Sequence, residues 1–594
     1  MSTKAIFLSL VLGGLALGLV STVSACGGNK PSTFDNGTDA APNDDGSGDE
    51  YVEPILPPSD AGEGGGNVTH CSADLHSILN EQNQVLMTCP ADQGCGAGGC
   101  VPACDSAAQN KSSIGCDYYS YELDALGGYH GGCFAAYIAN TWGVPITLTA
   151  DYNGQKLSMA NMARIPSGKG NAITYNPLPG GMLPAGQIAI LFLAQSSSIA
   201  CPQGVAPGLS TDGATTGTGI GHAFHISSTA PVAAYDIYPF GGSTSFIASA
   251  TLLLPTTAWG DNYVVVAPFF KDVAVSSAQQ STSIVASADG TTVTINPINP
   301  IVAGNGVAGT GKNVPHTYSL KKGEVLQFTQ DDELTGSAIQ SNKPVGLWGS
   351  ATCFNIDVSD VYCDAAHQQI PPVSALGHEY VAVRYRNRNK ANPEELVPWR
   401  VVGAVNGTNL TYFPKAPKNA PTTTGFGKLT AFWDTGPFVI QSQDDMHPFY
   451  ISAHMTGQDY APVSGTGDPE FVNIIPPQEF LPSYVFFTDV TYANTNLVLV
   501  RKDTGSGYSD VNLDCLGVVK GWKPINGTTY QYTTVDISVD SMAQGKCDNG
   551  LHTIKSDAPF GLTVWGWDQY CSYAYPAGAS VQPINTVVVP AVPH

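Results

Sequence analysis

Histidines offer the most direct route to metal or acid–base chemistry, so their spacing is examined first. His378 and Glu379 are adjacent, but the second histidine that would complete a zinc-binding H-E-x-x-H motif is absent. His222 and His225 lie three residues apart on an expected strand, where their side chains would face opposite sides. Because neither spacing suits a shared ion, we predict no catalytic histidine, no resident metal and no cofactor.

Serine hydrolases of the α/β type need a nucleophile elbow with the pattern G-x-S-x-G. The nearest stretch runs from Gly241 through Ser243 and lacks the closing glycine. A triad built from residues far apart in the sequence stays open, since such sets have no fixed order along the chain. We therefore predict a protein that is not an enzyme, with an extracellular hydrolase as the alternative.

Three aspartates form a weak candidate for calcium binding. Asp357, Asp360 and Asp364 stand at intervals of three and four residues beside an expected disulfide loop. Loop carboxylates suit Ca²⁺, which prefers oxygen ligands, although the EF-hand pattern is absent. A solvated acidic loop is the simpler interpretation of the same residues.

Aromatic residues gather near the C-terminal end of the sequence. Trp565, Trp567, Tyr570 and Tyr573 lie close together beside glycine and proline. Such rings bind glycans or protein partners through large amphipathic faces. They also fill the cores of β-sandwiches, and core packing is the simpler interpretation here.

Cysteines indicate how the elements around these residues are held together. The sequence contains 14 cysteines, and five of them crowd between residues 71 and 104. In an exported protein this crowding predicts disulfide bonds, whereas a zinc knot, the alternative, lacks a C-x-x-C pair. The disulfide candidates are Cys71, Cys89, Cys95, Cys100, Cys104, Cys116, Cys133, Cys201, Cys353, Cys363, Cys515 and Cys547, with 353/363 and 515/547 as local pairs and Cys571 left over.

The beginning of the sequence predicts export and lipid attachment. Residues 1–25 combine Lys4 with an apolar stretch that is too short to span a bilayer comfortably. The small residues before Cys26 resemble a bacterial lipobox, which predicts a lipid on Cys26; an ordinary secretory signal is the alternative. Residues 26–70, rich in Gly, Pro, Ser, Asn and Asp, predict a disordered acidic stalk.

Composition restricts the class of partner. The 594 residues are 43 % hydrophobic and only 12 % charged, with a formal net charge of −23. This charge argues against nucleic acid, which needs a basic footprint, and against adsorption to anionic lipid. Attachment to a membrane would therefore rest on the lipid anchor.

One short pattern recurs four times and predicts repeated modules. An isoleucine, a serine two residues later and a proline beyond it follow one another from Ile226, Ile339, Ile440 and Ile554. The third copy holds three extra residues before the proline. Each copy is expected to form strand, tight turn and strand, with the isoleucine in the core. The serine is expected either to share the isoleucine's face or to bond local backbone at the corner.

Further landmarks keep the same register and indicate the fold class. Tyr263 recurs as Tyr380, and the hairpin glycine Gly290 recurs as Gly407, in both cases 117 residues later. Short strands with turn signals between them, and no long 3.6-residue period, are typical of a β-sandwich. We predict an all-β fold of about four tandem β-sandwich-like modules after a disulfide-rich collar, with a β-propeller-like arrangement as the alternative.

The expected divisions follow from these landmarks. They are 1–25 signal peptide, 26–70 lipidated cysteine and stalk, 71–115 collar, and β modules over 116–250, 251–366, 367–470 and 471–594.

Three stretches together carry a resemblance to a known family. They are Ala223–Asp236, Ala250–Gly260 with Tyr263, and Ile339–Val345. Through them the region from about Cys116 to Ile584 resembles the N-terminal domain of the IgGFc-binding protein family, in its bacterial lipoprotein branch. The resemblance implies a secreted, β-rich binding or structural module; it supplies no catalytic residues and does not itself imply antibody binding.

These features predict a membrane-anchored cell-surface lipoprotein that acts in binding or adhesion. It would be exported and lipid-anchored to the bacterial envelope, at the outer membrane or cell surface. The expected partners are the membrane, through the lipid, and a protein or glycan ligand that the sequence does not identify. An extracellular hydrolase and a purely structural envelope protein are the alternatives.

Overall fold

The computed structural model describes residues 69–72, 74–82, 84–168, 172–268, 278–356, 363–388, 394–458 and 466–592. The chain splits into two compact units, residues 1–65 and 66–594, and all described residues belong to the second. The predicted signal peptide, Cys26 and nearly all of the stalk lie outside the described residues. In the part that is described, no helix has the length and apolar character needed to cross a membrane.

A small collar precedes the larger sheets and is stapled by cysteines. Its elements are β1 (Thr69–Cys71), β2 (Ser77–Asn80), β3 (Val85–Thr88), β4 (Gln93–Gly96), β5 (Gly99–Pro102) and α1 (Ala103–Asn110). Apart from cysteines, Ile78 is the main apolar residue buried in the core of the collar. The collar therefore depends on disulfide bonds for stability that a small apolar core cannot provide.

The prediction of a disulfide framework is confirmed. Six bonds join Cys71–Cys95, Cys89–Cys100, Cys104–Cys116, Cys133–Cys201, Cys353–Cys363 and Cys515–Cys547. Cys571 is buried and lies outside these bonds.

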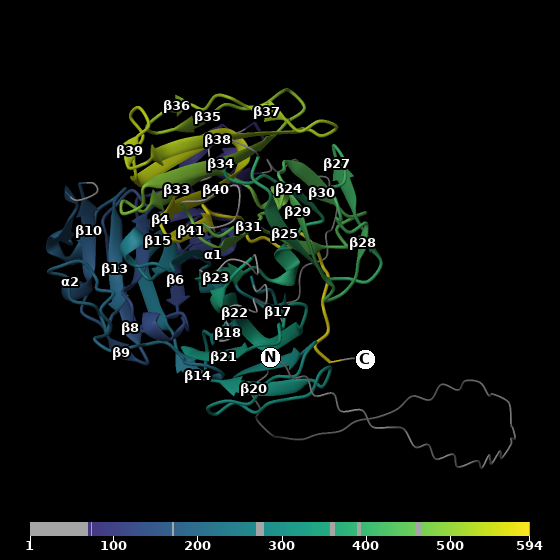
Figure 1. Cartoon of the computed structure of the whole chain (residues 1–594). Helices are drawn as coiled ribbons and strands as arrows, with labels where there is room; N and C mark the ends of the chain where they lie inside the picture. Colours follow the sequence, from purple (N-terminus) through teal and green to yellow (C-terminus); the bar gives the residue numbers. More distant parts are fainter. Residues whose placement is uncertain are drawn as a thin grey trace, which may run out of the picture. The chain divides into compact units, whose positions relative to one another are not determined.

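Four successive sets of β-strands, here called modules 1 to 4, make up the rest (Figure 1). Module 1 holds β6 (Ile114–Ser120), β7 (Phe134–Asn140), β8 (Ile146–Tyr152), β9 (Gln155–Lys156), β10 (Ala163–Ser167), β11 (Thr174–Pro177), β12 (Met182–Leu183), β13 (Ile188–Ala194), β15 (Phe224–Tyr238) and β16 (Ser249–Leu253), with the short helix α2 (Met159–Met162). Module 2 holds β14 (Gly219–His222), β17 (Gly260–Val264), β18 (Gln280–Ala286), β19 (Thr291–Asn296), β20 (His316–Leu320), β21 (Glu324–Gln330), β22 (Ala338–Phe354) and β23 (Asp364–Ile370).

Modules 3 and 4 follow in sequence. Module 3 holds β24 (Glu379–Ala382), β25 (Val397–Gly403), β26 (Thr408–Asn409), β27 (Thr411–Phe413), β28 (Thr423–Thr424), β29 (Leu429–Asp434), β30 (Phe438–Gln441), β31 (Phe449–Met455) and β32 (Glu470–Asn473). Module 4 holds β33 (Leu481–Thr488), β34 (Asn494–Lys502), β35 (Val511–Leu513), β36 (Gly517–Val518), β37 (Lys523–Pro524), β38 (Tyr530–Val539), β39 (Met542–Ala543), β40 (Gly550–Asp568) and β41 (Cys571–Pro576).

In modules 1, 2 and 4 one long strand joins two layers of strands at the repeated proline. In module 2 the start of β22 pairs with β17 and β19, and its later part pairs with β18 and β23. The tight turn predicted before Pro344 is therefore wrong. Proline can adopt extended backbone, although it has no N–H to donate to a neighbouring strand. The strand therefore loses one hydrogen bond at Pro344 and continues past it. The Ser341 hydroxyl donates to the Lys343 carbonyl at 2.7 Å, which confirms its predicted role at the corner.

The three extra residues in the third copy explain why module 3 looks different. There the long strand is interrupted between β30 and β31, and the module's strands fall into separate sheets. β30 pairs with β24 and β27, whereas β31 pairs with β25 and β32. The insertion thus divides one bent strand into two without changing which partners each half has.

A tyrosine clasps the corner in every module. The tyrosine is the pairing partner of the repeated isoleucine on the neighbouring strand, as in Tyr263↔Ile339 and Tyr380↔Ile440. Its hydroxyl donates to the carbonyl just after the corner proline, at 2.7 Å for Tyr263 with Val345. The same strand pairing occurs for Tyr118↔Ile226 and Tyr484↔Ile554. The hydroxyls of Tyr118, Tyr380 and Tyr484 donate to the carbonyls of Val232, Phe449 and Phe560, respectively. All four isoleucines are buried, which confirms their predicted place in the core.

The last strand of each module packs against the last strand of the next. β16 contacts β23, β23 contacts β32, β32 contacts β41, and β41 contacts β16, so these strands close a ring. The predicted all-β fold of tandem sheet modules is confirmed. The cyclic order is the feature that the propeller-like alternative predicts, while each module keeps two layers of strands.

The segment 579–591 ties the ring together. Ser113, just before module 1, exchanges hydrogen bonds with Ala579: its backbone N–H donates to the Ala579 carbonyl at 2.8 Å, and its hydroxyl accepts from the Ala579 N–H at 3.0 Å. Further along, the Asn262 side chain in module 2 holds both the carbonyl and the N–H of Val589, at 2.7 and 2.8 Å.

Candidate functional site

A serine, a histidine and an aspartate meet among the inner strands. His367 on β23 places Nε2 2.7 Å from Asp236 Oδ1 and Nδ1 3.2 Å from Ser249 Oγ. These residues come from three strands far apart in sequence, so no local motif marks them. All three are 0 % exposed, so no substrate reaches the serine.

The same serine is already committed to neighbours that hold the ring. Its hydroxyl accepts from the His367 backbone N–H at 3.0 Å and donates to Glu470 at 3.3 Å. Burial raises the pKa of Glu470 well above its usual range, against the opposing hydrogen bonds from Phe471 and Ser249. The constellation is therefore a buried polar core that joins modules 1, 2 and 3.

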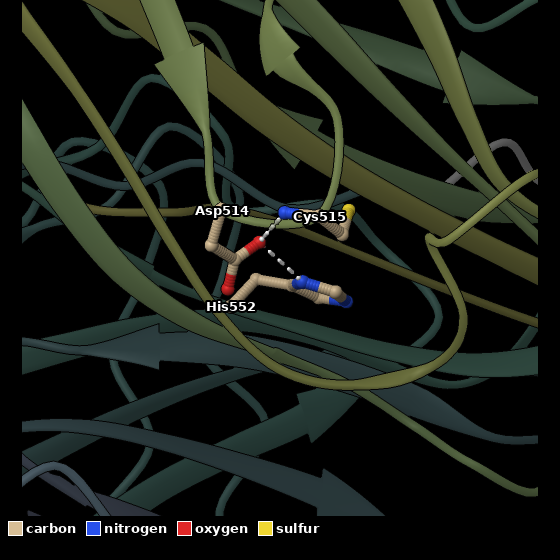
Figure 2. Close-up of side chains that lie close together, drawn as sticks. All are labelled: Asp514, Cys515 and His552. Carbon is tan, nitrogen blue, oxygen red and sulfur yellow. Dashed lines mark hydrogen bonds and ion pairs between the residues drawn. The ribbon is translucent and has the colours of Figure 1, made fainter.

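A second cluster combines metal-ligating residue types in module 4. Asp514, Cys515 and His552 bring their ligand atoms within 4.8 Å of one another. Figure 2 shows Asp514 reaching both the Cys515 backbone N–H, at 2.7 Å, and His552 Nδ1, at 3.0 Å. The sulfur of Cys515 is bonded to Cys547, so it offers no thiolate to a metal.

The histidine of this cluster is engaged on both sides, since His552 Nε2 lies 2.7 Å from the Asp548 carbonyl. Burial would raise the pKa of Asp514, but the hydrogen bond and charge of His552 outweigh it, and the pKa is lowered. These contacts hold the loop closed by the Cys515–Cys547 disulfide in place and do not form a metal centre.

The aromatic residues singled out in the sequence belong to the cores. Trp565 and Trp567 are each 1 % exposed and flank the ring of Tyr385, with centroids 4.8 and 5.9 Å away. Tyr573 is likewise buried, and Tyr570 is half-buried. They fill the space between layers instead of forming a binding face.

The weak calcium candidate does not form a described site. Asp357 and Asp360 lie outside the described residues. Asp364 lies at the start of the inner strand β23 and is 1 % exposed.

An open groove between modules 1 and 2 is the best-formed binding feature. It has a volume of about 620 Å³. Module 1 supplies Tyr119 and His225, and module 2 supplies the turn 321–324. The remaining lining residues are Asp151, Asn153, Gly154, His222, Ala223 and Asp289, so charged and polar groups predominate.

His225 is the most highly constrained side chain in this groove. Its Nε2 lies 2.5 Å from Asp117 Oδ1 and its Nδ1 lies 2.9 Å from Asp151 Oδ2. The imidazole also stacks on Tyr119, with centroids 4.7 Å apart and planes 24° from parallel. Tyr119 on β6 and Asp151 on β8 stand directly opposite His225. Asp117 stands two residues farther along β6, so the alternation of side chains places it on the same face.

The charges around His225 reinforce one another. Burial would lower the pKa of His225, but the hydrogen bonds and charges of Asp117 and Asp151 outweigh it, and the pKa is raised. Burial would raise the pKa of Asp117, but its bond to His225 outweighs that effect and lowers the pKa. The groove thus holds an imidazole between two carboxyl groups, beside the lysines of the 321–324 turn.

The structure corrects the sequence interpretation of the two nearby histidines. His222 and His225 were expected on one strand with opposite orientations. Instead the strand breaks at Ala223: His222 ends β14 in module 2, and His225 lies on β15 in module 1. Both therefore line the same groove.

Comparison with known proteins places the chain in a family. A family model described as IgGFc binding protein matches residues 249–566, more than half of the chain. The chain belongs to the IgGFc-binding protein family. The matched segment holds module 2 except β14, all of module 3 and most of module 4, with three of the four tyrosine clasps.

A human protein of this family provides a second comparison. The IgGFc-binding protein of Homo sapiens is 25 % identical over 354 residues. The match covers 58 % of this chain but only 6 % of the human protein, so the chain spans a small part of that relative's length. No solved structure matches. The groove lies partly in the matched segment, through Asp289 and residues 321–324, and partly in residues before it.

Proposed function

We propose that this protein is a lipid-anchored cell-surface binding protein whose groove at His225 takes a polar segment of a protein ligand. The observation that carries the proposal is the groove itself. It is open, and it is lined by side chains of both charges with an aromatic ring at its wall. The two clusters whose residue types suggest catalysis or a metal are, by contrast, buried or disulfide-locked.

The groove suits recognition because it is already organised. The double clamp on His225 and the stacked Tyr119 fix the side chains before a ligand arrives, which reduces the entropy lost on binding. Lys321 and Lys322 add exposed cations that steer an acidic or polar partner. The name of the human relative states that it binds IgG Fc; for this chain the Fc fragment serves as a first probe.

The anchor and stalk form the second half of the proposal. A lipid on Cys26, followed by the acidic stalk, would hold the collar and modules away from a bacterial membrane. This role agrees with the sequence pattern before Cys26 and with family membership. It would make the protein an adhesion component of the outer envelope.

Binding is tested with the purified full chain against the Fc fragment of human IgG and a glycan array. We expect binding to a protein probe, weakened about tenfold by His225→Gln or Lys322→Gln, an effect of about 1.4 kcal/mol. Lys415→Gln, at an exposed site away from the groove, serves as the matched control. Turnover of a glycan or ester panel by the wild type would instead favour the hydrolase alternative.

Anchoring is tested separately by expression in a bacterial host that processes lipoproteins. The Cys26→Ser variant should leave the membrane fraction and change its processing. Unchanged fractionation and processing of that variant would show that the anchor assignment is wrong while leaving the groove proposal intact.

A further inference from the structure

A second cavity, between modules 3 and 4, has the opposite electrostatic character from the chain as a whole. It has a volume of about 230 Å³ and lies between the segment after β24 and the strands β37 and β38. Its cationic lining residues are Arg384, Arg386 and Lys523, and Glu394 is its one acidic lining residue among those described. In a sequence with 25 Lys and Arg against 48 Asp and Glu, this concentration of cations is unusual.

The two arginines differ in how their charges are compensated. Arg386 donates to Asp536 at 2.6 Å and stacks over Trp567 at 4.8 Å, so its charge is largely matched. Arg384 is only 9 % exposed, and its hydrogen bonds go to neutral acceptors. Those acceptors are the carbonyls of Thr435 and Tyr385 and the side-chain oxygen of Asn387, at 3.0, 2.8 and 2.5 Å.

Neighbouring groups leave a positive excess in the cavity. Close by, Arg388 and Glu395 form a buried pair at 2.6 Å and neutralise each other. Among the described residues that line or contact the cavity, Glu394 and Asp536 stand against three cations, so positive charges outnumber negative ones by one. Burying a guanidinium without a nearby anion costs free energy. An anionic ligand that binds beside the guanidinium offsets that cost.

We propose that this cavity binds a small oxyanion, a carboxylate or sulfate group, with Arg384 as its main partner and Lys523 at its mouth. A guanidinium carries five N–H groups in a planar fork, and Arg384 uses three nitrogens for bonds that orient it. Its remaining N–H groups suit the paired oxygens of such an anion. Tyr532, which also lines the cavity, offers a ring face for the sugar or other group that carries the anion.

The site is independent of the His225 groove, so either proposal can fail alone. Each of the two uses different modules and different residues, and the anion site needs no protein partner. The proposed source of the anion is either a free ion or an acidic sugar, and the chemistry that the cavity recognises is the same in both.

Calorimetry on the purified full chain tests the site with sodium sulfate, sodium glucuronate and glucose, each at constant ionic strength held with chloride. We expect sulfate and glucuronate to bind and to compete, and glucose not to bind. Arg384→Gln should weaken both anions at least tenfold, and Lys523→Gln should weaken them about threefold. Equal binding of glucose and glucuronate, or no response to either anion beyond chloride, would overturn the proposal.

A matched pair of lysines guards against misfolding and general charge effects. Lys523 lies over the ring of Tyr532 at 5.9 Å, and Lys502 lies over the ring of Tyr530 at 5.4 Å but does not line the cavity. Both are exposed, so both variants to Gln should fold. Anion affinity that falls in Lys523→Gln and not in Lys502→Gln supports the site, and equal affinities in the two variants contradict it.

Discussion

Two histidines in this molecule have similar partners and opposite surroundings. His367 contacts Asp236 and Ser249 among the inner strands, and its side chain is 0 % exposed. His225 contacts Asp117 and Asp151 in the groove, and its side chain is 17 % exposed. Each is held through both ring nitrogens, yet only His225 is accessible to another molecule.

The difference shows that access, rather than residue type, separates a site from a scaffold here. At the ring, polar groups from three modules satisfy one another and fix which strands meet. At the groove, the clamp organises a surface that remains open to a partner. A list of serine, histidine and aspartate would favour the first constellation as an active site, and burial excludes it.

The largest effect is expected from breaking the buried constellation. His367→Ala removes the hydrogen-bond partner of Asp236 Oδ1. The buried Asp236 side chain then keeps the hydrogen bond that the Ser120 hydroxyl donates to Oδ2. Leaving a buried hydrogen-bonding group unsatisfied costs about 1–3 kcal/mol, and the cavity left by the ring adds to that loss. Chemical denaturation should show this loss. A variant of wild-type stability would mean that the inner strands do not depend on this network.

A purely apolar truncation sharpens the comparison by separating lost volume from lost polar contacts. Ile339 is 0 % exposed and faces Tyr263, so Ile339→Ala should cost about 2–5 kcal/mol. Ile554→Ala should behave alike, since it holds the same place in module 4. Thermal unfolding measures both. Wild-type stability combined with lost ligand binding would instead make these corners contact residues.

A smaller loss is expected at the tyrosine clasp. Tyr380→Phe removes the donor to the Phe449 carbonyl and the acceptor for the Gly377 N–H while keeping the ring. Unsatisfied buried groups of this kind cost about 1–3 kcal/mol. Unfolding in urea should show that loss, with Fc and glycan binding unchanged. Altered binding at full stability would assign the clasp to a site.

The smallest effect on stability is expected at the groove, where it depends on pH. The raised pKa of His225 gives stability that is present below its ordinary value of about 6.5 and is lost as pH rises through the raised value. The lowered pKa of Asp117 gives stability that is lost as pH falls through that lowered value. Stability should therefore decline in alkali by about 1 kcal/mol or less, since both groups are partly exposed.

The control for this effect is the His225→Gln variant measured over the same range. Its unfolding free energy should lack the decline above neutral pH, and its ligand affinity should fall at every pH. A decline of equal size in the variant would assign the pH dependence to other groups.

Much of the fold was readable because the repeats are local. The tandem β modules follow from landmarks that recur at similar spacing, and the buried isoleucines follow from alternation beside a recurring corner. What the sequence did not reveal is that Tyr263 and Ile339 face each other. Each belongs to a separate repeated pattern, and only the register of the sheet brings the two together.

The candidate sites were less accessible to sequence reasoning, for a physical reason. The groove and the anion cavity each join side chains from two modules, so their members stand far apart along the chain. The dense aromatic cluster at Trp565 was visible but packs inward. One local signal was present at His367: several polar residues on a short strand, Asp364–Ile370, predict a buried polar network once that strand is known to be central.

The bonds of residues 579–591 set an order for biogenesis. Chains are made from the N-terminus, so Ser113 and Asn262 are synthesised well before their partners in residues 579–591. Before that segment is made, β41 can already pack against β16, but the bonds to Ser113 and Asn262 are absent. The segment therefore adds its bonds to a ring whose strands are already made.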